Sequence, residues 1–289
     1  MRVLISGQHG QVSRELQRRL GGVGELIVLG RDQLDLAQPE QIRQQVQKVR
    51  PDLIINAAAH TAVDLAESEP ETAFAINAVA PGIFAEEALK LGIPLIHYST
   101  DYVFDGMKVG PYTEDDTPNP LGVYGRSKLA GERAITDVQG KHLILRTSWV
   151  YSAHGRNFLL TMQRLLQERP EVRIVADQIG APTWAGSIAN STLALIERWQ
   201  AGEAVTWGTY HLTAQGKTSW FGFAQAIGEA LRQQGKPCAN LLPIPSSDYP
   251  TPAARPLNSC LDCSLLQREW SVSQPDWQIA LRECLAEQG

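Results

Sequence analysis

Tyr124 and Lys128 have types and a spacing that could do chemistry, because they stand four positions apart in a segment that runs on to Arg133. On a helix, residues four apart share one face. A phenol has a pKa near ~10, and a nearby ammonium favours the phenolate and lowers that pKa. Thr100, at the carboxyl end of the apolar run 94–99, could hold a carbonyl oxygen beside the phenol. These residues predict a carbonyl-reducing site, although a Tyr and a Lys at this spacing also occur in ordinary helices.

The first twenty residues predict a phosphate-binding turn. A short apolar run at 2–6 is followed by Gly7, Gly10 and an amphipathic run from Arg14 to Leu20. This order reads as strand, glycine turn and helix. Glycines in such a turn permit positive φ and a close approach of the backbone, so that N–H groups at a helix N-terminus can bind a pyrophosphate. We therefore expect a dinucleotide here.

The end of the second expected strand favours NADPH over NADH. About twenty residues after the glycine turn, a dinucleotide fold often places an acidic residue on the adenosine ribose. This chain has Gly30 and Arg31 instead. With no carboxylate to repel it, a 2′-phosphate could pair with the guanidinium of Arg31. Alternatively, Arg31 could be an ordinary solvated charge in a loop.

Three motifs together resemble the extended short-chain dehydrogenase/reductases. They are Gly-x-x-Gly-x-x-Ser at 7–13, Ser-Thr-Asp-Tyr-Val-Phe at 99–104 and Tyr-x-x-x-Lys at 124–128. Further matching stretches lie at 56–64, 146–151, 178–183 and 255–259, so the resemblance spans nearly the whole chain. One departure is Ser13, where the family usually has glycine or alanine. We expect its small hydroxyl to fit between helix and strand.

Within this family the chain resembles reductases of 4-keto sugars carried on dTDP. The resemblance implies reduction of the C4 keto group of dTDP-4-dehydro-L-rhamnose by NADPH, with NADH left open as a donor. The product would be dTDP-L-rhamnose for cell-surface polysaccharide synthesis. Thr100 would hydrogen-bond the substrate oxygen, Tyr124 would give it a proton, and Lys128 would hold the nicotinamide ribose and lower the pKa of the tyrosine. A divalent metal such as Mg²⁺ and a homodimer are both left open.

The resemblance and the turn chemistry together define the expected site. Asp35 and Leu36 resemble the family's adenine-contacting pair, and Asn77 resembles an asparagine that orders the surroundings of the lysine, although it would also suit a buried structural amide. The expected cofactor contacts are Gly7, Gly10, Gln11, Val12, Arg31, Asp35, Leu36, Ala57, Ala58, Ala59, His60, Thr61, Tyr98, Tyr124 and Lys128. The expected substrate contacts are Thr100, Asp101, Trp149, Asn157 and Arg255. Arg255 lies in a proline-rich loop and would bind the diphosphate.

Two other functions stay open. The chain could be another nucleotide-sugar epimerase or dehydratase, and net consumption of NADPH would separate an epimerase from a reductase. A dehydratase would need an acid and a base beside Thr100, whereas Asp101 is followed by Tyr102 where that pattern has Glu. Non-catalytic NADP-binding regulatory subunits of methionine adenosyltransferase also share the pattern. The intact set of Thr100, Tyr124 and Lys128 does not exclude such a subunit, but the close motif match and the lack of an N-terminal extension lead us to expect the enzyme.

Composition excludes several classes of protein. At 289 residues, 43% hydrophobic and a net charge of −5, the chain can form one large α/β domain with a smaller lobe, and it lacks the basic runs of nucleic-acid binders. No stretch approaches eighteen apolar residues, and no signal peptide precedes the first strand, so we expect a cytoplasmic protein without membrane contact. The four cysteines do not suggest a disulfide framework, and the six histidines share no metal-ligand spacing.

Alternating patterns predict a Rossmann-like, doubly wound parallel sheet over residues 1–151, rejoined by parts of 184–212, with 152–289 forming mainly a substrate-binding lobe. The expected strands are 2–6, 25–29, 53–56, 94–99 and 142–146, and the expected helices are 12–20, 39–49, 70–91 and 123–135. In the lobe we expect helices at 157–167, 187–199 and 220–234, strands at 172–175 and 210–212, a loop at 243–256 and two short helices after 262.

Overall fold

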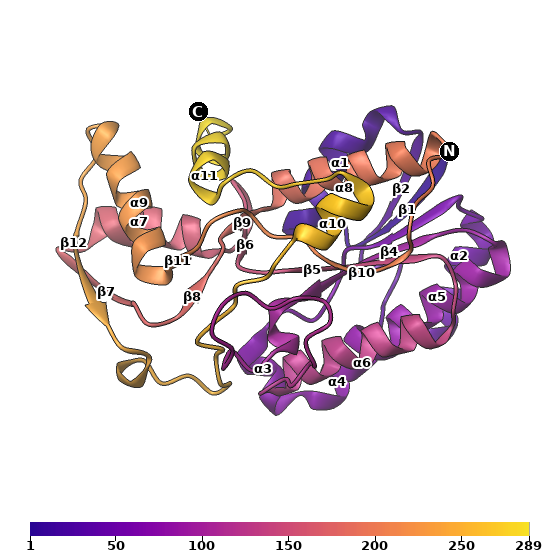
Figure 1. Cartoon of the computed structure of the whole chain (residues 1–289), viewed down its shortest axis with the longest axis horizontal. Coiled ribbons are helices and arrows are strands. Elements are labelled where there is room, and N and C mark those ends of the chain that lie inside the picture. Colours follow the sequence, from indigo (N-terminus) through magenta and orange to yellow (C-terminus); the bar gives the residue numbers. More distant parts are fainter. Residues whose placement is uncertain (289) are drawn as a thin grey trace.

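The computed structural model describes residues 1–288 and has a parallel six-stranded sheet at its centre. The strands are β1 (Arg2–Ser6), β2 (Glu25–Leu29), β3 (Leu53–Asn56), β4 (Leu95–Thr100), β5 (His142–Thr147) and β10 (Gly208–His211), in the spatial order β10-β5-β4-β3-β1-β2 (Figure 1). Every neighbouring pair is parallel. The predicted doubly wound α/β class is confirmed.

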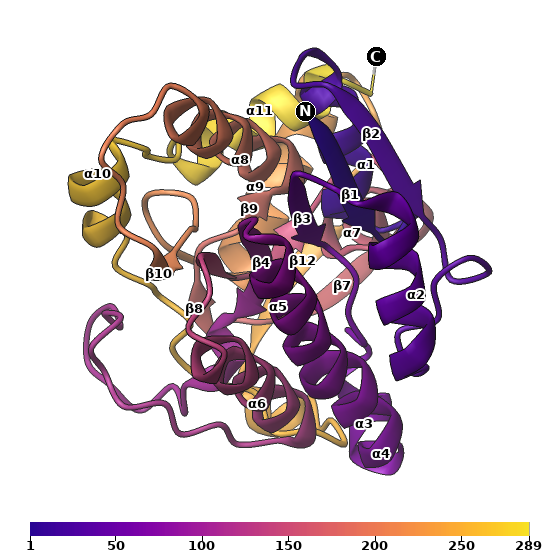
Figure 2. The same ribbon diagram turned by 90° about the vertical axis from the view of Figure 1, so that its right-hand side faces the viewer.

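Helices cover both faces of this sheet. One face carries α1 (Gln11–Arg19), α8 (Ala185–Gln200) and α10 (Ser264–Trp270), and the other carries α2 (Pro39–Val49), α5 (Ala80–Leu91) and α6 (Val123–Asp137) (Figures 1 and 2). Because helices cover both faces of the sheet, β3 is buried at all four of its residues, and Leu53, Ile54 and Ile55 are apolar. The chain leaves β1 for β2 on one side and reaches β3 on the other. The switch point, where such sheets bind ligands, therefore lies between the ends of β1 and β3.

The expected helix 70–91 is interrupted. It consists of α4 (Pro70–Phe74), a π-helical segment η2 (Ala75–Val79) and α5, and it is preceded by α3 (Val63–Ser68), which the sequence analysis missed. A π-helical turn adds one residue to the helix and is frequent at functional sites. Here it carries Asn77, which is fully buried.

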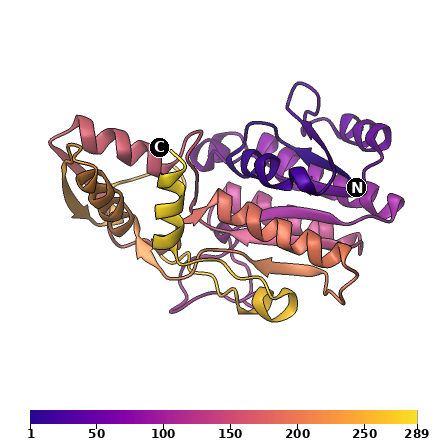
Figure 3. The same ribbon diagram turned by 90° about the horizontal axis from the view of Figure 1, so that it is seen from above.

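A second, smaller layer forms the other end of the molecule (Figure 3). It contains α7 (Phe158–Glu168), α9 (Trp220–Gln233) and α11 (Trp277–Ala286) around their own apolar core. Three two-stranded sheets complete it: β6 (Val150–Tyr151) with β9 (Thr183–Trp184), β7 (Glu171–Val175) with β12 (Asn240–Ile244), and β8 (Ile179–Gly180) with β11 (Thr218–Ser219). The expected loop 243–256 was wrong at its start, because Pro243 lies in β12. Among residues 1–288 that strand pairs only with β7, and an edge strand tolerates a proline. The rest of that segment contains η4 (Ser246–Asp248).

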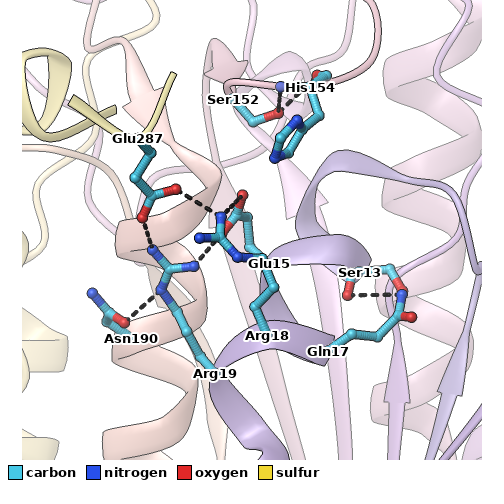
Figure 4. Close-up of polar contacts among 9 residues, drawn as sticks. All are labelled: Ser13, Glu15, Gln17, Arg18, Arg19, Ser152, His154, Asn190 and Glu287. Carbon is cyan, nitrogen blue, oxygen red and sulfur yellow. Dashed lines mark hydrogen bonds and ion pairs between the residues drawn. The ribbon is translucent and has the colours of Figure 1, made fainter. Parts of the chain in front are cut away.

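Charged side chains connect α1 to α11 (Figure 4). Arg18 and Arg19 both pair with Glu287, at 2.7 and 2.9 Å, and both also contact the buried carboxylate of Glu15. Asn190 on α8 accepts a hydrogen bond from Arg19 at 2.8 Å. No helix within residues 1–288 is long and apolar enough to cross a membrane.

Candidate active site

Helix α6 lies unusually close to the backbone of two neighbouring segments. A Cβ at Gly125 would collide with the carbonyl oxygen of Tyr102, and one at Gly131 would collide with that of Asn77. The helix begins where the carboxylate of Glu67, on α3, accepts the backbone N–H of Val123 at 2.7 Å. A carboxylate also interacts favourably with the positive end of the helix dipole. These contacts fix the first turn of α6, and Tyr124 with it.

Tyr124 is buried beside the end of β4. Its ring packs edge-on against Tyr102, with centroids 5.5 Å apart. Burial raises the pKa of Tyr124, and a hydrogen bond with Thr100 acts in the opposite direction. The pKa of Tyr124 is therefore raised overall and not lowered as expected, because desolvation of the phenolate is the largest influence on it. Tyr124 is thus a protonated phenol at neutral pH.

Thr100 and Asp101 form a buried pair next to that phenol. The hydroxyl of Thr100 donates to Asp101 Oδ1 at 3.0 Å and accepts the backbone N–H of Tyr102 at 3.2 Å. Burial raises the pKa of Asp101 to about 6, against the opposing effect of hydrogen bonds from Ser259 and Thr100. Thr100 must turn from Asp101 before its proton can reach a substrate oxygen.

Lys128 lies on the buried face of α6, as its spacing from Tyr124 predicts, and its side chain reaches β4. Its Nζ is 2.7 Å from the carbonyl oxygen of Tyr98, to which it donates, and 3.0 Å from Nε2 of His97. Burial lowers the pKa of Lys128 to about 8, and the charge of Glu132 opposes this. No carboxylate within residues 1–288 forms an ion pair with it.

The sequence analysis missed the role of the carboxylate one turn further along α6. Glu132 accepts two hydrogen bonds from Arg146 on β5, at 3.0 and 2.7 Å, and both side chains are about 5% exposed. Ser99 also donates to Glu132. This pair locks α6 to β5 beside the catalytic candidates.

Asn77 holds the π-helical turn against two other elements. Its amide accepts the N–H of His60 at 2.8 Å and donates to the carbonyl of His60 and to the hydroxyl of Ser127, each at 3.0 Å. Ser127 in turn donates to the carbonyl oxygen of Tyr124. Asn77 therefore positions α6, in line with the supporting role that the resemblance implied.

The glycine turn has the geometry of a close approach at one glycine only. Gly7 adopts φ +88°, and a Cβ there would lie 2.9 Å from that of Ala58. Gly10 has an ordinary φ of −65°, so only Gly7 uses the positive φ that both glycines permit. As the N-cap of α1, Gly10 has no side chain to cap the first N–H groups of the helix. Ser13 is fully buried, so its hydroxyl fits between helix and strand.

Most other expected cofactor contacts gather at the same sheet edge. Gln11 and Val12 begin α1, Arg31 is exposed just beyond β2, and Ala57, Ala58, Ala59, His60 and Thr61 follow β3. Asp35 accepts the N–H of Ala37 at 3.0 Å, and Leu36 is buried against the α2 side of the sheet. Tyr98 is different, because its hydroxyl contacts Thr192 of α8 at 2.7 Å, on the far face of the sheet. Only its carbonyl faces Lys128.

A cleft of about 790 Å³ opens beside Tyr124. None of Thr100, Tyr124 and Lys128 lines it, and the connection is Tyr102, which lines the cleft and packs on Tyr124. The walls combine aromatic, basic and apolar side chains, which suits a nucleotide. They include Tyr102, Phe158, Trp220 and Tyr249, Arg169, Arg173 and Arg255, and Met162, Leu165 and Ile174.

Arg255, which the sequence analysis expected to bind the diphosphate, lies in that wall. Its Nη2 pairs with Asp64 at 2.8 Å, and its guanidinium lies 6.0 Å from the ring centroid of Tyr102. Its Nη1 is buried without a hydrogen-bond partner among residues 1–288. This donor is not committed to another group, and the side chain would have to move for it to reach an anionic oxygen in the cleft.

Two expected substrate contacts have structural roles here. Trp149 stacks on Trp220, with ring centroids 3.6 Å apart, and so supports a cleft residue rather than lining the cleft itself. Asn157 caps α7 by accepting the N–H of Leu160, and its amide donates to Gln11, Ser152 and His154. An asparagine at the start of an apolar periodic run is a typical N-cap, and that signal was present in the sequence.

No group of three or more His, Cys, Asp or Glu side chains in the described part of the chain, residues 1–288, is placed to hold a metal ion.

Comparisons with known proteins agree over the whole length. A family model described as the RmlD substrate binding domain matches residues 1–289. A dTDP-4-dehydrorhamnose reductase of Burkholderia thailandensis is 47% identical, over 99% of this chain and 98% of its own length, and that of Escherichia coli K12 is 45% identical over the same shares. The crystal structure of a dTDP-4-dehydrorhamnose reductase from Bacillus anthracis in complex with NADP superposes with a TM-score of 0.92, at 36% identity and 99% coverage of both chains.

Proposed function

The chain belongs to the RmlD substrate-binding domain family, and we propose that it acts there as a reductase of dTDP-4-dehydrorhamnose. The observation that carries this is the match to such reductases along the full length of both chains. The protein is an NADP-dependent oxidoreductase that reduces the C4 keto group and yields dTDP-L-rhamnose. The product serves nucleotide-sugar and polysaccharide biosynthesis.

The residues at the switch point fit a dinucleotide. Gly7 brings the backbone of the turn against Ala58, and α1 begins at Gly10 without a side-chain cap, so its first N–H groups can bind a pyrophosphate. Arg31 is exposed and forms no ion pair within residues 1–288, which leaves it available to a 2′-phosphate. When bound, NADPH supplies the hydride that reduces C4. Lys128 would hold the nicotinamide ribose.

Tyr124 would then donate a proton to the oxygen that develops negative charge at C4. Burial keeps the phenol protonated before the reaction. The ammonium of Lys128, buried on the same helix, would stabilise the phenolate that remains. Thr100, released from Asp101, would hydrogen-bond the same substrate oxygen. The cleft would hold the nucleotide, and Arg255 would bind the diphosphate through the free Nη1.

We further expect a cytoplasmic enzyme that handles a small nucleotide sugar, and a homodimer remains a prediction that sedimentation analysis can test. The sheet with α8 and β10 would hold the cofactor, and the smaller layer around α7 and α9 would hold the nucleotide.

The direct test follows NADPH absorbance with purified protein and dTDP-4-dehydro-L-rhamnose. A reductase consumes one NADPH for each keto sugar, whereas an epimerase regenerates its cofactor and a regulatory subunit consumes none. The same sugar carried on UDP or GDP tests the base.

Tyr124→Phe tests the site, because it removes one oxygen and keeps the ring. We expect turnover to fall by at least about 10²-fold, since general acid catalysis contributes about 10²–10⁴-fold. NADPH should still bind, as followed by fluorescence titration.

Tyr210→Phe is the matched control. It removes the same atom from another buried tyrosine, whose hydroxyl on β10 donates to the carbonyl oxygen of Thr206 at 2.7 Å. Its turnover should stay within a few-fold of wild type. Near-normal turnover of Tyr124→Phe would mean that the tyrosine and lysine of α6 are structural.

A further inference from the structure

A line of buried polar side chains connects the glycine turn to Lys128. Ser6, at the end of β1, donates to Asn56 Oδ1 at 2.6 Å. The amide of Asn56, at the end of β3, lies 3.0 Å from Nδ1 of His97 on β4, and His97 Nε2 lies 3.0 Å from Lys128 Nζ. Each of the four residues is at most 1% exposed.

His97 is the only side chain among residues 1–288 that forms a hydrogen bond with Lys128 Nζ, since its other partner is the backbone carbonyl of Tyr98. A buried ammonium without a carboxylate partner costs several kcal/mol unless its protons are hydrogen-bonded. Removing the imidazole would therefore leave one proton of the ammonium without an acceptor. The third N–H of Lys128 remains free for the phenol or the cofactor ribose.

The imidazole can accept from an ammonium in only one form. A neutral imidazole carries one N-bound proton, and an ammonium has three donors and no acceptor, so Nε2 must be unprotonated. Nδ1 then carries the proton and donates to the oxygen of the Asn56 amide. In this orientation the amide nitrogen donates to Ser6 Oγ, which reverses the Ser6–Asn56 hydrogen bond given above, and the two orientations of an amide occupy the same space. If the amide nitrogen faces Nδ1 instead, Nε2 carries the proton and Lys128 must be a neutral amine. The orientation of Asn56 and the charge of Lys128 are thus linked through His97.

We propose that His97 is a positioning residue of the reductase, and that its neutral Nδ1–H tautomer accepts a hydrogen bond from the Lys128 ammonium and so fixes both the place and the charge of that group. The proposal rests on the proposed function, because Lys128 must take part in the reduction for its position to matter. Burial and the charge of Lys128 both lower the pKa of His97 well below its usual range, so the imidazole is neutral throughout the working pH range.

The carboxylates of Glu132 and Glu87, on α6 and α5, are already paired with other cations. Glu132 is held by Arg146, and the charged side chain of Glu87 on α5 is paired with Arg43 and Lys90. The titratable and charged groups on the elements packed around Lys128 are His97 and Tyr98 on β4, Tyr124, Arg126, Glu132, Arg133 and Asp137 on α6, His142 and Arg146 on β5, Asp101 and Tyr102 in η3 (Asp101–Val103), Asp64 and Glu67 on α3, Glu71 on α4, and Glu86, Glu87 and Lys90 on α5.

The test compares His97→Leu and His97→Gln in the pH dependence of kcat with NADPH and dTDP-4-dehydro-L-rhamnose. Leucine removes the acceptor at similar bulk, so the alkaline limb, which we assign to Lys128, should move down by about one to two pH units, the equivalent of one hydrogen bond to a charged group. Glutamine offers a side-chain oxygen and should return the limb to within about half a unit. The KM for NADPH should rise in the leucine variant and recover in the glutamine variant.

His211→Leu is the control for a merely structural loss. His211 is a fully buried imidazole on β10, with Nδ1 3.2 Å from the carbonyl oxygen of Asp262 and no contact to Lys128. Its removal should lower stability without moving the alkaline limb. An unmoved limb in His97→Leu, or an equal shift in His211→Leu, would overturn the proposal.

Nitrogen-15 NMR of the histidine-labelled wild-type enzyme tests the tautomer of His97 directly, even if the leucine variant does not fold. The signals of His97 are assigned by their loss in His97→Gln. The Nδ1–H tautomer is expected, and the Nε2–H tautomer would refute the proposal. A normal pH profile in His97→Leu together with an inactive Tyr124→Phe would remove the role of His97 alone. Near-normal turnover of Tyr124→Phe would remove the proposed site itself.

Discussion

Lys128 and Arg146 are both buried cations near Glu132, yet their surroundings are opposite. Arg146 meets the carboxylate of Glu132 through two hydrogen bonds, whereas Lys128 has a neutral imidazole and a backbone carbonyl. Burial lowers the pKa of Lys128 to about 8, which means that its ammonium form is destabilised by the loss of solvation. In the proposed function, the cation that serves only the fold has a counter-charge, and the cation that would stabilise the phenolate of Tyr124 has none.

The largest expected effect on stability comes from breaking the ion pair of Glu132 and Arg146. Glu132→Gln should lower the free energy of unfolding by about 3–5 kcal/mol, because it leaves the guanidinium of Arg146 buried without its counter-charge. Urea unfolding at neutral pH measures this. The double variant Glu132→Leu with Arg146→Met should recover most of the loss, since an apolar pair of similar volume can replace a buried ion pair.

The exposed pair of Arg164 and Glu168 on α7 supplies the control, with both side chains more than half exposed. Glu168→Gln should change stability by less than about 1 kcal/mol. A loss of similar size at Glu132 would mean that burial does not decide the strength of these pairs.

Removing Lys128, as in Lys128→Met, should change how the free energy of unfolding depends on pH. The folded pKa of about 8 lies below the ordinary value of 10.5, so the unfolded chain binds a proton that the folded chain lacks between these pH values. Wild-type stability should therefore rise from pH 8 towards 10.5, by up to about 3 kcal/mol relative to the methionine variant. Denaturant titrations of both proteins at pH 7 and 9.5 measure the difference, in which all other titrating groups cancel. Parallel pH profiles would show that Lys128 is solvated or paired.

Arg255 is an intermediate case, because it has a carboxylate partner but lies in the wall of an open cleft. Its side chain is 20% exposed and that of Asp64 is 43% exposed. Arg255→Ala should change stability by less than about 1 kcal/mol. It should nonetheless raise the KM for the nucleotide sugar by about 10-fold or more, the equivalent of about 1.5–3 kcal/mol for a charge-assisted hydrogen bond.

Asp64→Asn is the matched variant, because it loosens the same loop without removing the cation. It should leave the sugar KM within a few-fold of wild type. Loss of NADPH affinity in parallel with sugar affinity would assign Arg255 to the fold.

Arg31 should have the smallest effect on the fold, because it is exposed and has no ion-pair partner within residues 1–288. Arg31→Ala should leave the unfolding curve unchanged. It should raise the KM for NADPH by about 10-fold or more and leave that for NADH nearly unchanged, since only NADPH carries the 2′-phosphate. Equal effects on both cofactors would contradict the assignment.

The sequence predicted the sheet better than the elements that hold the site. The bounds of β1, β2, β3 and α2 agree with the structure, because buried parallel strands require continuous apolar runs and Pro39 marks the first turn of a helix. The π-helical turn around Asn77 could not be read, since an inserted residue depends on tertiary contacts with His60 and Ser127.

The site was predicted in its residue types and only partly in its contacts. Strand alternation alone would have separated Tyr98 from His97, because neighbours on a strand face opposite sides of the sheet. The partner of Glu132 could not be found, since Arg146 arrives from a separate strand. The predicted direction of the Tyr124 pKa shift was wrong, because the sequence shows that a lysine is near but not how deeply the phenol is buried.

Gly125 and Gly131 have a practical consequence for anyone who wishes to make this enzyme more robust. Replacing glycine by alanine inside a helix is a common route to higher thermostability, with a gain of about 0.5–1 kcal/mol. In α6 each added methyl group would collide with a backbone oxygen, that of Tyr102 or that of Asn77, and would push the helix outward. A design procedure guided by helix propensity would therefore select the two substitutions that displace Tyr124, so α6 should be kept fixed in any such library.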